Sequence, residues 1–284
     1  MSSVALPLLL NGATLGAAYA LAALGFVLAL NAVAAVNFAH GDLVMAGGML
    51  AVALAAAFPV DLPGIVWLPL AGLGAAGLGA LTGLAAYLPL RRKPPVAVFV
   101  STIAVGVGLQ NAALLLMGPE PRAVPPLFSQ ATQPFAIIIV AGLAVAATAA
   151  LLARTKFGRR LRAAAQDPDM ARACGVPVER LAVAAFALAA ALAGTAGALL
   201  GGQYFITPMA GGDFMLKTYI AVTIGGWGSP LGAVAGAVLI AFFETGVSLW
   251  LSHAWASVAL YAATLLILTR RPQGLFGEAA GRRA

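Results

Sequence analysis

The sequence predicts an all-α polytopic membrane protein with about eight transmembrane segments, and three observations lead to this fold class. Of the 284 residues, 62% are hydrophobic and only 9% are charged, whereas a soluble domain carries about 25% charged residues. Seven stretches without Asp, Glu, Lys or Arg are long enough for a spanning helix, which needs about 20 apolar residues. Stretches such as 181–192 also lack the alternation of polar and apolar residues that a transmembrane β-barrel requires.

Nearly all positive charge lies in three clusters. Of the 16 basic residues, all but Arg122 and Lys217 fall within 91–93, 154–180 and 270–283. Because Lys and Arg collect in cytoplasmic loops, we place all three clusters in the cytoplasm. The same bias explains the net charge of +7. We expect no nucleic-acid partner, since no basic stripe with interleaved aromatic residues is present.

Because all three clusters lie on the same side of the membrane, an even number of spans must separate each cluster from the next. We expect three segments before the first cluster, two before the second and four before the third, which places the N-terminus outside. The total is eight or nine in a single transmembrane domain over residues 1–284. The segments are expected near 5–30, 43–58, 64–90, 95–117, 134–153, 181–205, 231–250 and 254–269, with a short one before the break at 225–230.

The basic loop 154–180 predicts two short helices rather than a flexible tether. Helix-forming residues run from 157 to 166, after which Asp167 is a good N-cap and Pro168 a good first helical residue. Gly175 suits the position just after a helix end. The loop is either a solvated connector or a docking element for a cytoplasmic partner, since a rigid helical unit can transmit force to both flanking spans.

A few polar side chains interrupt the apolar stretches and are candidates for a solute pathway. The segment 37–42 (NFAHGD) either lines a cavity or forms an interfacial turn. Glu244 lies mid-stretch, where a charge costs at least about 2.5–3.5 kcal/mol, so we expect a buried side chain that is protonated or that faces a partner or a wet cavity. The alternative is a solvated position near an interface. Polar residues in 101–111 either bond across helices or meet a solute. The candidates are Asn37, His40, Asp42, Gln110, Asn111 and Glu244.

Enzyme motifs are absent from the sequence. No G-x-x-x-x-G-K-[ST] phosphate loop occurs, so we do not expect this chain to hydrolyse ATP. HExxH, CxxC and G-x-S-x-G motifs are also missing. The one His and one Asp of segment 37–42 are too few for a metal site. We therefore expect no catalytic residue, metal or cofactor in this chain.

Several strings match a known family in order and nearly end to end. The specific ones are NFAHGD at 37–42 and RPQGLFG at 271–277. Less specific matches, rich in Gly, Ala or charged residues, lie at 11–25, 158–168, 175–180, 193–197 and 225–229. With these strings the chain resembles the LivH-type permease subunit of branched-chain amino-acid ABC importers. The arginine-rich turn at 89–92 departs in position from the family pattern.

The resemblance implies a multi-pass subunit of the bacterial inner membrane that translocates branched-chain or related amino acids. It implies a LivM-like second permease subunit, two cytoplasmic ABC ATPases that hydrolyse the ATP, and an extracytoplasmic solute-binding protein. Similar permeases serve leucine-type amino acids, urea or short amides, and the pathway is homodimeric or heterodimeric. The implied ATPase-coupling residues are Arg162, Gln166, Asp167, Pro168, Asp169, Arg172 and Gly175.

Two other function classes remain as alternatives. One is a proton-coupled secondary transporter of a small polar solute, with Glu244 or Asp42 as the proton carrier. The other is a membrane scaffold without a transport role. Transport by this chain alone without ATP would favour the first alternative, and unchanged uptake after Glu244→Ala would favour the second.

Overall fold

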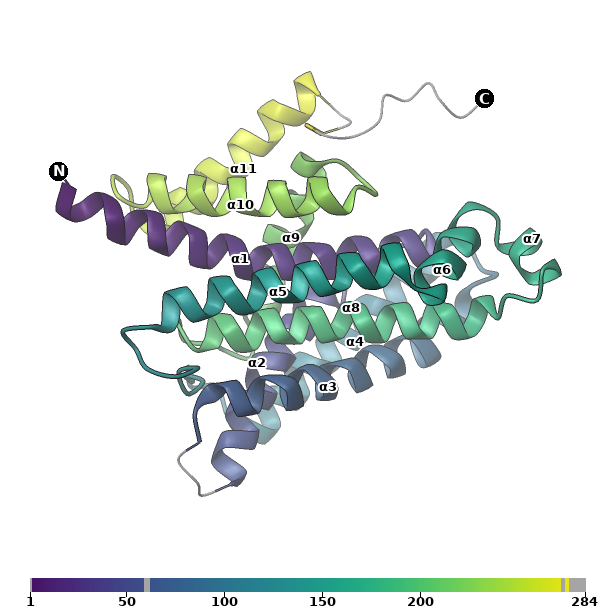
Figure 1. Cartoon of the computed structure of the whole chain (residues 1–284), viewed down its shortest axis with the longest axis horizontal. Helices are drawn as coiled ribbons and strands as arrows, with labels where there is room; N and C mark the ends of the chain where they lie inside the picture. The colour runs from purple at the N-terminus through teal and green to yellow at the C-terminus, as the bar shows by residue number, and fades with distance from the viewer. Residues whose placement is uncertain (1, 59–61, 272–273, 276–284) are drawn as a thin grey trace.

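The structure is a computed structural model that describes residues 2–58, 62–271 and 274–275. Within these residues the chain is mainly helical, and strand-like pairing is limited to one isolated bridge between Arg122 and Ile206. The helices, in chain order, are α1 (Ser2–Val33), α2 (His40–Ala57), α3 (Gly64–Thr82), η1 (Gly83–Tyr87), η2 (Leu88–Leu90), α4 (Pro95–Met117), α5 (Gln133–Arg154), α6 (Lys156–Gln166), α7 (Pro168–Ala173), α8 (Val178–Gly201), α9 (Gly211–Gly225), α10 (Pro230–Val247) and α11 (His253–Arg270) (Figure 1).

The helix lengths confirm an all-α polytopic membrane protein. Among the described residues, seven helical segments are long and apolar enough to span a bilayer, and α11 is a shorter apolar helix. The expected break at 225–230 is also present. It separates α9, with only 15 residues, from α10. At this break Gly226 and Gly228 have φ values of 105° and 81°, which side chains rarely allow, and the Ser229 side chain caps α10 by accepting from Gly232 N–H at 3.0 Å.

The predicted segment 64–90 is continuous but not uniformly α-helical. It passes from α3 through a π-helical turn, η1, into a 3₁₀ turn, η2. Pro89 lies within η2 and has no N–H to donate to a preceding carbonyl, and its ring crowds the preceding turn of an α-helix. The change in helical winding is the expected response to that residue near a helix end.

Close approach of backbones holds the centre of the bundle together. α8 packs between α2 and α3 and also against α1. A Cβ atom added at Gly47 of α2 would collide with the backbone of Gly194 in α8, and one added at Gly197 would collide with the Val44 carbonyl. In lipid, where dispersion contacts drive helix association, glycines at such crossings allow the closest packing.

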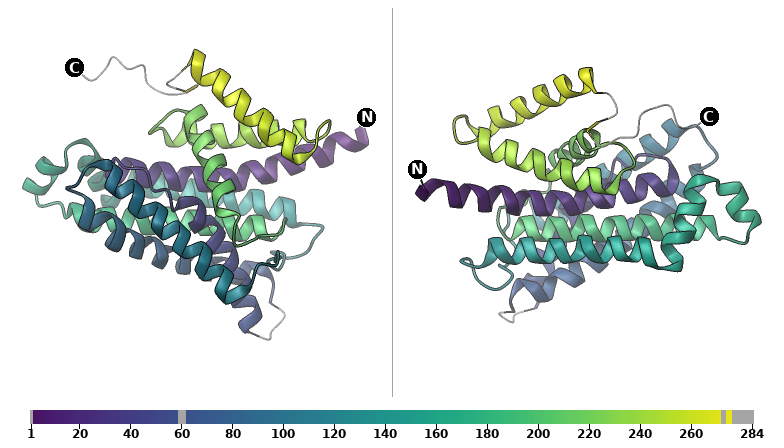
Figure 2. Two further views of the ribbon diagram at one scale, coloured as in Figure 1. Left: turned by 180° about the vertical axis from the view of Figure 1, so that it is seen from behind. Right: turned by 45° about the horizontal axis from the view of Figure 1, so that its top comes forward.

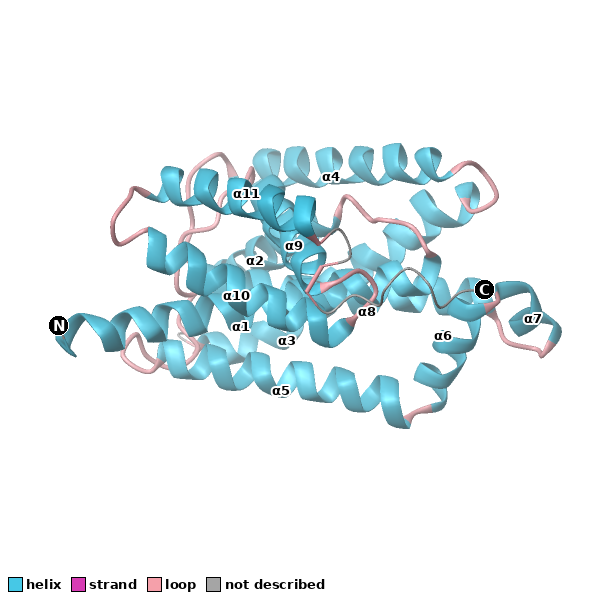
Figure 3. Cartoon of the chain, turned by 90° about the horizontal axis from the view of Figure 1, so that it is seen from above, coloured by secondary structure: helices cyan, strands magenta, loops and turns pink. Residues whose placement is uncertain are grey.

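The outer helices expose large apolar surfaces. α4 and α5 flank the bundle on opposite sides (Figure 3), and only 17% of the spanning part of each is buried. Exposed residues such as Leu115, Leu116 and Leu143 lie on these helices. This is the surface expected of helices that face lipid or another membrane subunit.

The two ends of the bundle differ in charge. α6 and α7 project beyond the end opposite the N-terminus (Figures 1 and 2). Arg91 lies 3.7 Å from Glu179 at the start of α8, and Leu275 N–H donates to the Ile224 carbonyl beside the 225–230 break. The described basic residues of all three clusters therefore gather at one end, as the charge pattern predicts. Arg282, Arg283 and most of the RPQGLFG string lie outside the described residues.

Candidate functional site

The segment between α1 and α2 runs into the interior of the bundle. His40, the first residue of α2, is fully buried, and its Nε2 donates to the Ala22 carbonyl of α1 at 2.9 Å. Ala22 lies well inside α1, so α2 begins beside the body of that helix rather than at the end of the bundle. His40 Nδ1 has no hydrogen-bond partner among the described residues. The NFAHGD segment is thus packed inside the bundle rather than exposed as a surface loop.

Two side chains accept hydrogen bonds from the backbone N–H groups of this buried link. Asn37 is buried and its Oδ1 accepts from Ala39 N–H at 3.1 Å. Phe38 N–H donates to Thr102 Oγ1 of α4 at 3.2 Å. Non-helical backbone at membrane depth is tolerated only where protein or an internal cavity surrounds it. Asn37 and Thr102 therefore allow the chain to turn inside the bundle.

The carboxylate of Asp42 lies where α2, α4 and α9 meet. Its Oδ1 accepts from Gln110 Nε2 at 2.7 Å. A Cβ atom at Gly106 of α4 or at Gly211 of α9 would collide with the carboxylate oxygens. The two glycines thus form the walls around this carboxylate, and Gln110 orients it.

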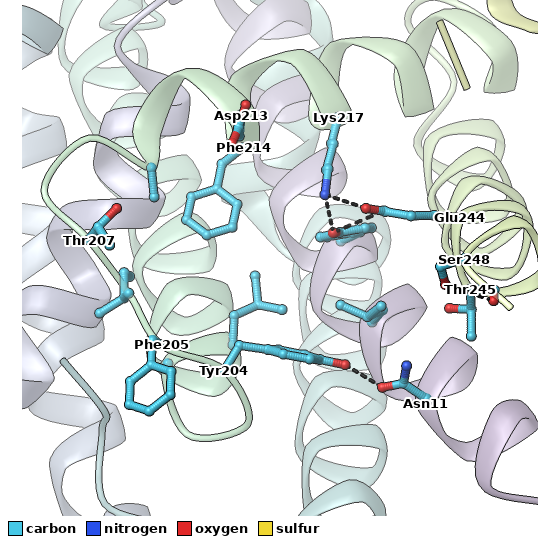
Figure 4. A pocket seen from close by; sticks show the side chains of 16 residues that line it. Asn11, Tyr204, Phe205, Thr207, Asp213, Phe214, Lys217, Glu244, Thr245 and Ser248 are labelled. Atoms are coloured by element: carbon cyan, nitrogen blue, oxygen red, sulfur yellow. Dashed lines mark hydrogen bonds and ion pairs between the residues drawn. The ribbon is translucent and has the colours of Figure 1, made fainter. Parts of the chain in front are cut away.

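A second polar cluster joins α1, α9 and α10. Lys217 Nζ is 2.6 Å from Glu244 Oε1 and donates to the Tyr19 hydroxyl at 3.1 Å. That hydroxyl donates to Glu244 Oε2 at 3.3 Å. Glu244 is only 2% exposed. Lys217, which points toward Glu244 (Figure 4), supplies the opposite charge that a buried carboxylate needs.

This cluster forms one wall of an open cavity of about 360 Å³. Asn11 and Tyr204 are hydrogen-bonded to each other across another part of the lining (Figure 4). The apolar lining includes Leu15, Leu200 and Phe214. Since the lining comes from the N-terminal half of α1 and from the ends of α8 and α10, the cavity lies toward the end of the bundle opposite α6 and α7.

The structure divides the predicted pathway residues into separate groups. Asn37, His40, Asp42 and Gln110 surround the start of α2, whereas Glu244 belongs to the cavity. Asn111 joins neither group, because it is exposed on α4 and its Nδ2 donates to the Val107 carbonyl of its own helix at 2.8 Å.

Sequence reasoning missed Lys217 and Tyr19, which are the partners of Glu244. It also missed the nearby hydrogen-bonded pair Asn11 and Tyr204. A signal for Lys217 was present, because it is one of only two basic residues outside the three clusters. A lone lysine and a lone glutamate in neighbouring apolar segments are expected to pair. The two tyrosines carried no comparable signal.

The α6–α7 unit is tied to α5, and α7 has the N-cap that the sequence predicts. Thr155 caps α6 by accepting from Gly158 N–H, and Arg162 Nη1 donates to the Leu152 carbonyl of α5 at 2.6 Å. Asp167 caps α7 by accepting from the N–H groups of Asp169 and Met170, with Pro168 as the first helical residue. Gln166 is exposed at the corner between the two helices.

The C-terminal end of α7 is also stabilised, by a backbone turn and by ion pairs. Gly175 has a φ of 77°, and its N–H donates to the Arg172 carbonyl while Val176 N–H donates to the Ala171 carbonyl. This is the hydrogen-bond pattern of a Schellman motif. Arg172 also pairs with Asp169 at 2.6 Å and with Glu179 at 3.2 Å, which links α7 to the start of α8.

Comparison with known proteins finds relatives whose sequences align with nearly the whole chain. The profile of a family described as "Branched-chain amino acid transport system / permease component" matches residues 8–269. The high-affinity branched-chain amino acid transport system permease protein LivH of Escherichia coli strain K12 is 32% identical over 94% of both chains. The corresponding permease protein BraD of Pseudomonas aeruginosa is 29% identical over 95% of both chains.

A solved structure shares the fold. A chain in the structure of PsaBC from Streptococcus pneumoniae in complex with Fab superposes with a TM-score of 0.51, at 15% sequence identity. The match covers 92% of this chain and 90% of that chain. At this identity the likeness concerns the arrangement of helices only.

Proposed function

Because this chain belongs to the family of permease components of branched-chain amino acid transport systems, we propose that it carries branched-chain amino acids across a bacterial inner membrane. In this proposal a LivM-like second permease subunit completes the pathway. Two cytoplasmic ABC ATPases bind and hydrolyse the ATP, and an extracytoplasmic solute-binding protein delivers the amino acid. The basic end of the bundle faces the cytoplasm, in keeping with the positive-inside rule.

The observation that carries this proposal is the rigid α6–α7 unit at the basic end. A flexible connector needs neither an N-cap at Asp167 nor a Schellman motif at Gly175, yet both are present. Such a unit presents a defined surface to a partner, and Met170 lies on it with 62% exposure. We assign this surface to the ATPases.

The contacts of α6 and α7 also connect this unit to two spanning helices. Arg162 holds α6 to the end of α5, and Arg172 holds α7 to Glu179 at the start of α8. Displacement of α6 and α7 by a closing ATPase dimer would therefore move α5 and α8 together. α8 packs against α1, α2 and α3, so this movement would reach the start of α2, which carries His40 and Asp42, and the link before it, which contains Asn37.

Under this proposal the buried link before α2 forms part of the translocation pathway. Asp42 and Gln110 provide polar groups within helices that are predominantly apolar. Asn111 faces out of the bundle on α4, where a second permease subunit would pack.

Replacing residues 167–175 with a flexible Gly-Ser segment of equal length tests the coupling assignment. The expected variant inserts into the membrane and pairs with the second permease subunit, but loses ATPase co-purification and ATP-driven leucine uptake. Membrane insertion and thermal stability are the controls for folding. Normal ATPase association and uptake in this variant would refute the assignment of α6 and α7.

A further inference from the structure

The chemistry of the cavity beside α9 suggests a specific ligand class. We propose that Lys217 and Glu244 bind the two charged groups of a zwitterionic α-amino acid in this cavity, the carboxylate at Lys217 and the ammonium at Glu244. The inference rests on the proposed function, and it adds a solute-binding station within the permease itself. The cavity volume of about 360 Å³ lies at the lower end of the roughly 300–1,000 Å³ typical of small-molecule sites.

The geometry of the ion pair matches the charge pattern of the ligand. Lys217 Nζ and Glu244 Oε1 lie side by side at 2.6 Å, just as the ammonium and carboxylate groups of an amino acid lie side by side on one carbon. A zwitterion can insert between the two side chains and exchange their mutual contact for two new ones. The site remains charge-balanced during this exchange, which avoids an uncompensated buried charge.

Hydrogen-bonding groups are available around the pair. Thr245 is only 4% exposed and lines the cavity, yet its Oγ1 has no hydrogen-bond partner among the described residues. The Tyr19 hydroxyl already contacts both charged side chains.

The apolar part of the lining favours an aliphatic side chain on the ligand. Leu15, Leu200 and Phe214 come from three different helices and face the same cavity as the ion pair. Burial of apolar ligand surface against such residues stabilises binding by about 25 cal/mol per Å². The combination of paired charges with an apolar wall fits a leucine-type amino acid.

The overall charge of the lining argues against an anionic solute. Asp213 lines the cavity one helical turn before Lys217 and is exposed. The lining therefore carries two acidic side chains and one basic side chain. A carboxylate without an ammonium group would meet net repulsion there.

Protection of an engineered cysteine tests the site directly. Cys174 is the single cysteine of the chain, so Cys174→Ser combined with Ser248→Cys gives one thiol in the cavity lining. In the assembled importer without ATP, saturating leucine should slow methanethiosulfonate labelling of this cysteine about tenfold, a factor set by site occupancy. 4-Methylpentanoate, which lacks the ammonium group, should give little protection, and leucinamide, which lacks the carboxylate and leaves Lys217 without a new partner, should protect less than leucine.

In the Cys174→Ser, Ser248→Cys variant, the further substitutions Lys217→Met and Glu244→Gln remove both charges together. A protein often tolerates such a joint replacement of a buried ion pair without loss of folding. Protection by leucine should then disappear, while Lys93→Met in the exposed basic turn should leave it intact. The inference is overturned if leucine gives no protection, or if protection survives loss of both charges. ATP-driven leucine uptake by the wild-type importer tests the proposed function separately, so the two failures are distinguishable.

Discussion

Asp42 shows how single residues determine a buried polar site in this bundle. Its carboxylate fits between Gly106 and Gly211 because neither has a Cβ atom, and Gln110 holds it by one hydrogen bond. Neighbouring glycines in the same helices are different, since a Cβ atom added at Gly108 or Gly212 would meet nothing within 4 Å. The chain thus offers matched pairs for testing the packing around the carboxylate.

We predict that Gly106→Ala and Gly211→Ala destabilise the protein and lower uptake, because overpacking of a filled interior costs about 1–3 kcal/mol. Gly108→Ala and Gly212→Ala should be neutral or slightly stabilising, because alanine is the better helix former by about 1 kcal/mol. Thermal unfolding of the purified complexes measures the difference. Equal stability of all four variants would contradict the packing described for Asp42.

At the level of single residues, the sequence predicts features that follow from local sequence or from a general physical rule. Glu244 was expected to have a partner because an isolated buried charge is costly. Identifying Tyr19 as part of that cluster was not possible, since Tyr19 and Glu244 are 225 positions apart. Such pairing depends on the tertiary arrangement of three helices.

At the scale of helices, α7 depends on its two ends. It has only six residues, and isolated helices shorter than about 12–15 residues are marginal in water. Asp167 at its start and Gly175 after its end provide local stabilisation, and the ion pairs of Arg172 fix its position.

Asp167→Ala should therefore loosen α7, because loss of an N-cap costs about 0.5–2 kcal/mol. Asp167→Asn should preserve the helix, since asparagine caps about equally well. We expect weaker ATPase association and slower uptake for the alanine variant alone, measured by titration of the ATPase onto the reconstituted permease. Equal weakening by both substitutions would mean that the charge of Asp167 matters and its capping does not.

Helix prediction is most accurate in the segments that local sequence features delimit. The segment 95–117 matches α4, and the expected helices of the basic loop match α6 and α7, with the predicted cap of α7 at Asp167. The start of α2 was placed three residues too late, because a helix beginning inside the bundle needs tertiary contacts such as that of His40 with Ala22. The π-helical turn before Pro89 was not predicted, since the local sequence does not specify how a helix absorbs a proline.

At the scale of the whole molecule, the two regions to which we assign a function lie toward opposite ends. The basic clusters and the α6–α7 unit occupy one end, and the cavity with Lys217 and Glu244 lies toward the other. Charge distribution allowed the first region to be predicted. The cavity was not predictable, because its lining comes from segments between Asn11 and Ser248 that only the folded chain brings together.

Cys174 allows this orientation to be tested without engineering. It is exposed beside the end of α7, on the end that we place in the cytoplasm. A membrane-impermeant maleimide should label it in inside-out vesicles and not in intact spheroplasts. In the Cys174→Ser, Ser248→Cys variant the pattern should be reversed. Labelling of Cys174 from the periplasm would contradict the proposed orientation.

The central claim is that this chain transports amino acids only when separate ATPases drive it. The most direct measurement is leucine uptake into proteoliposomes that contain this chain with its second permease subunit and solute-binding protein, with and without the ATPases and ATP. Uptake that requires both the ATPases and ATP, and that persists when the proton gradient is dissipated, is the predicted result. Leucine accumulation by this chain alone, without ATP and driven by a proton gradient, would contradict the claim.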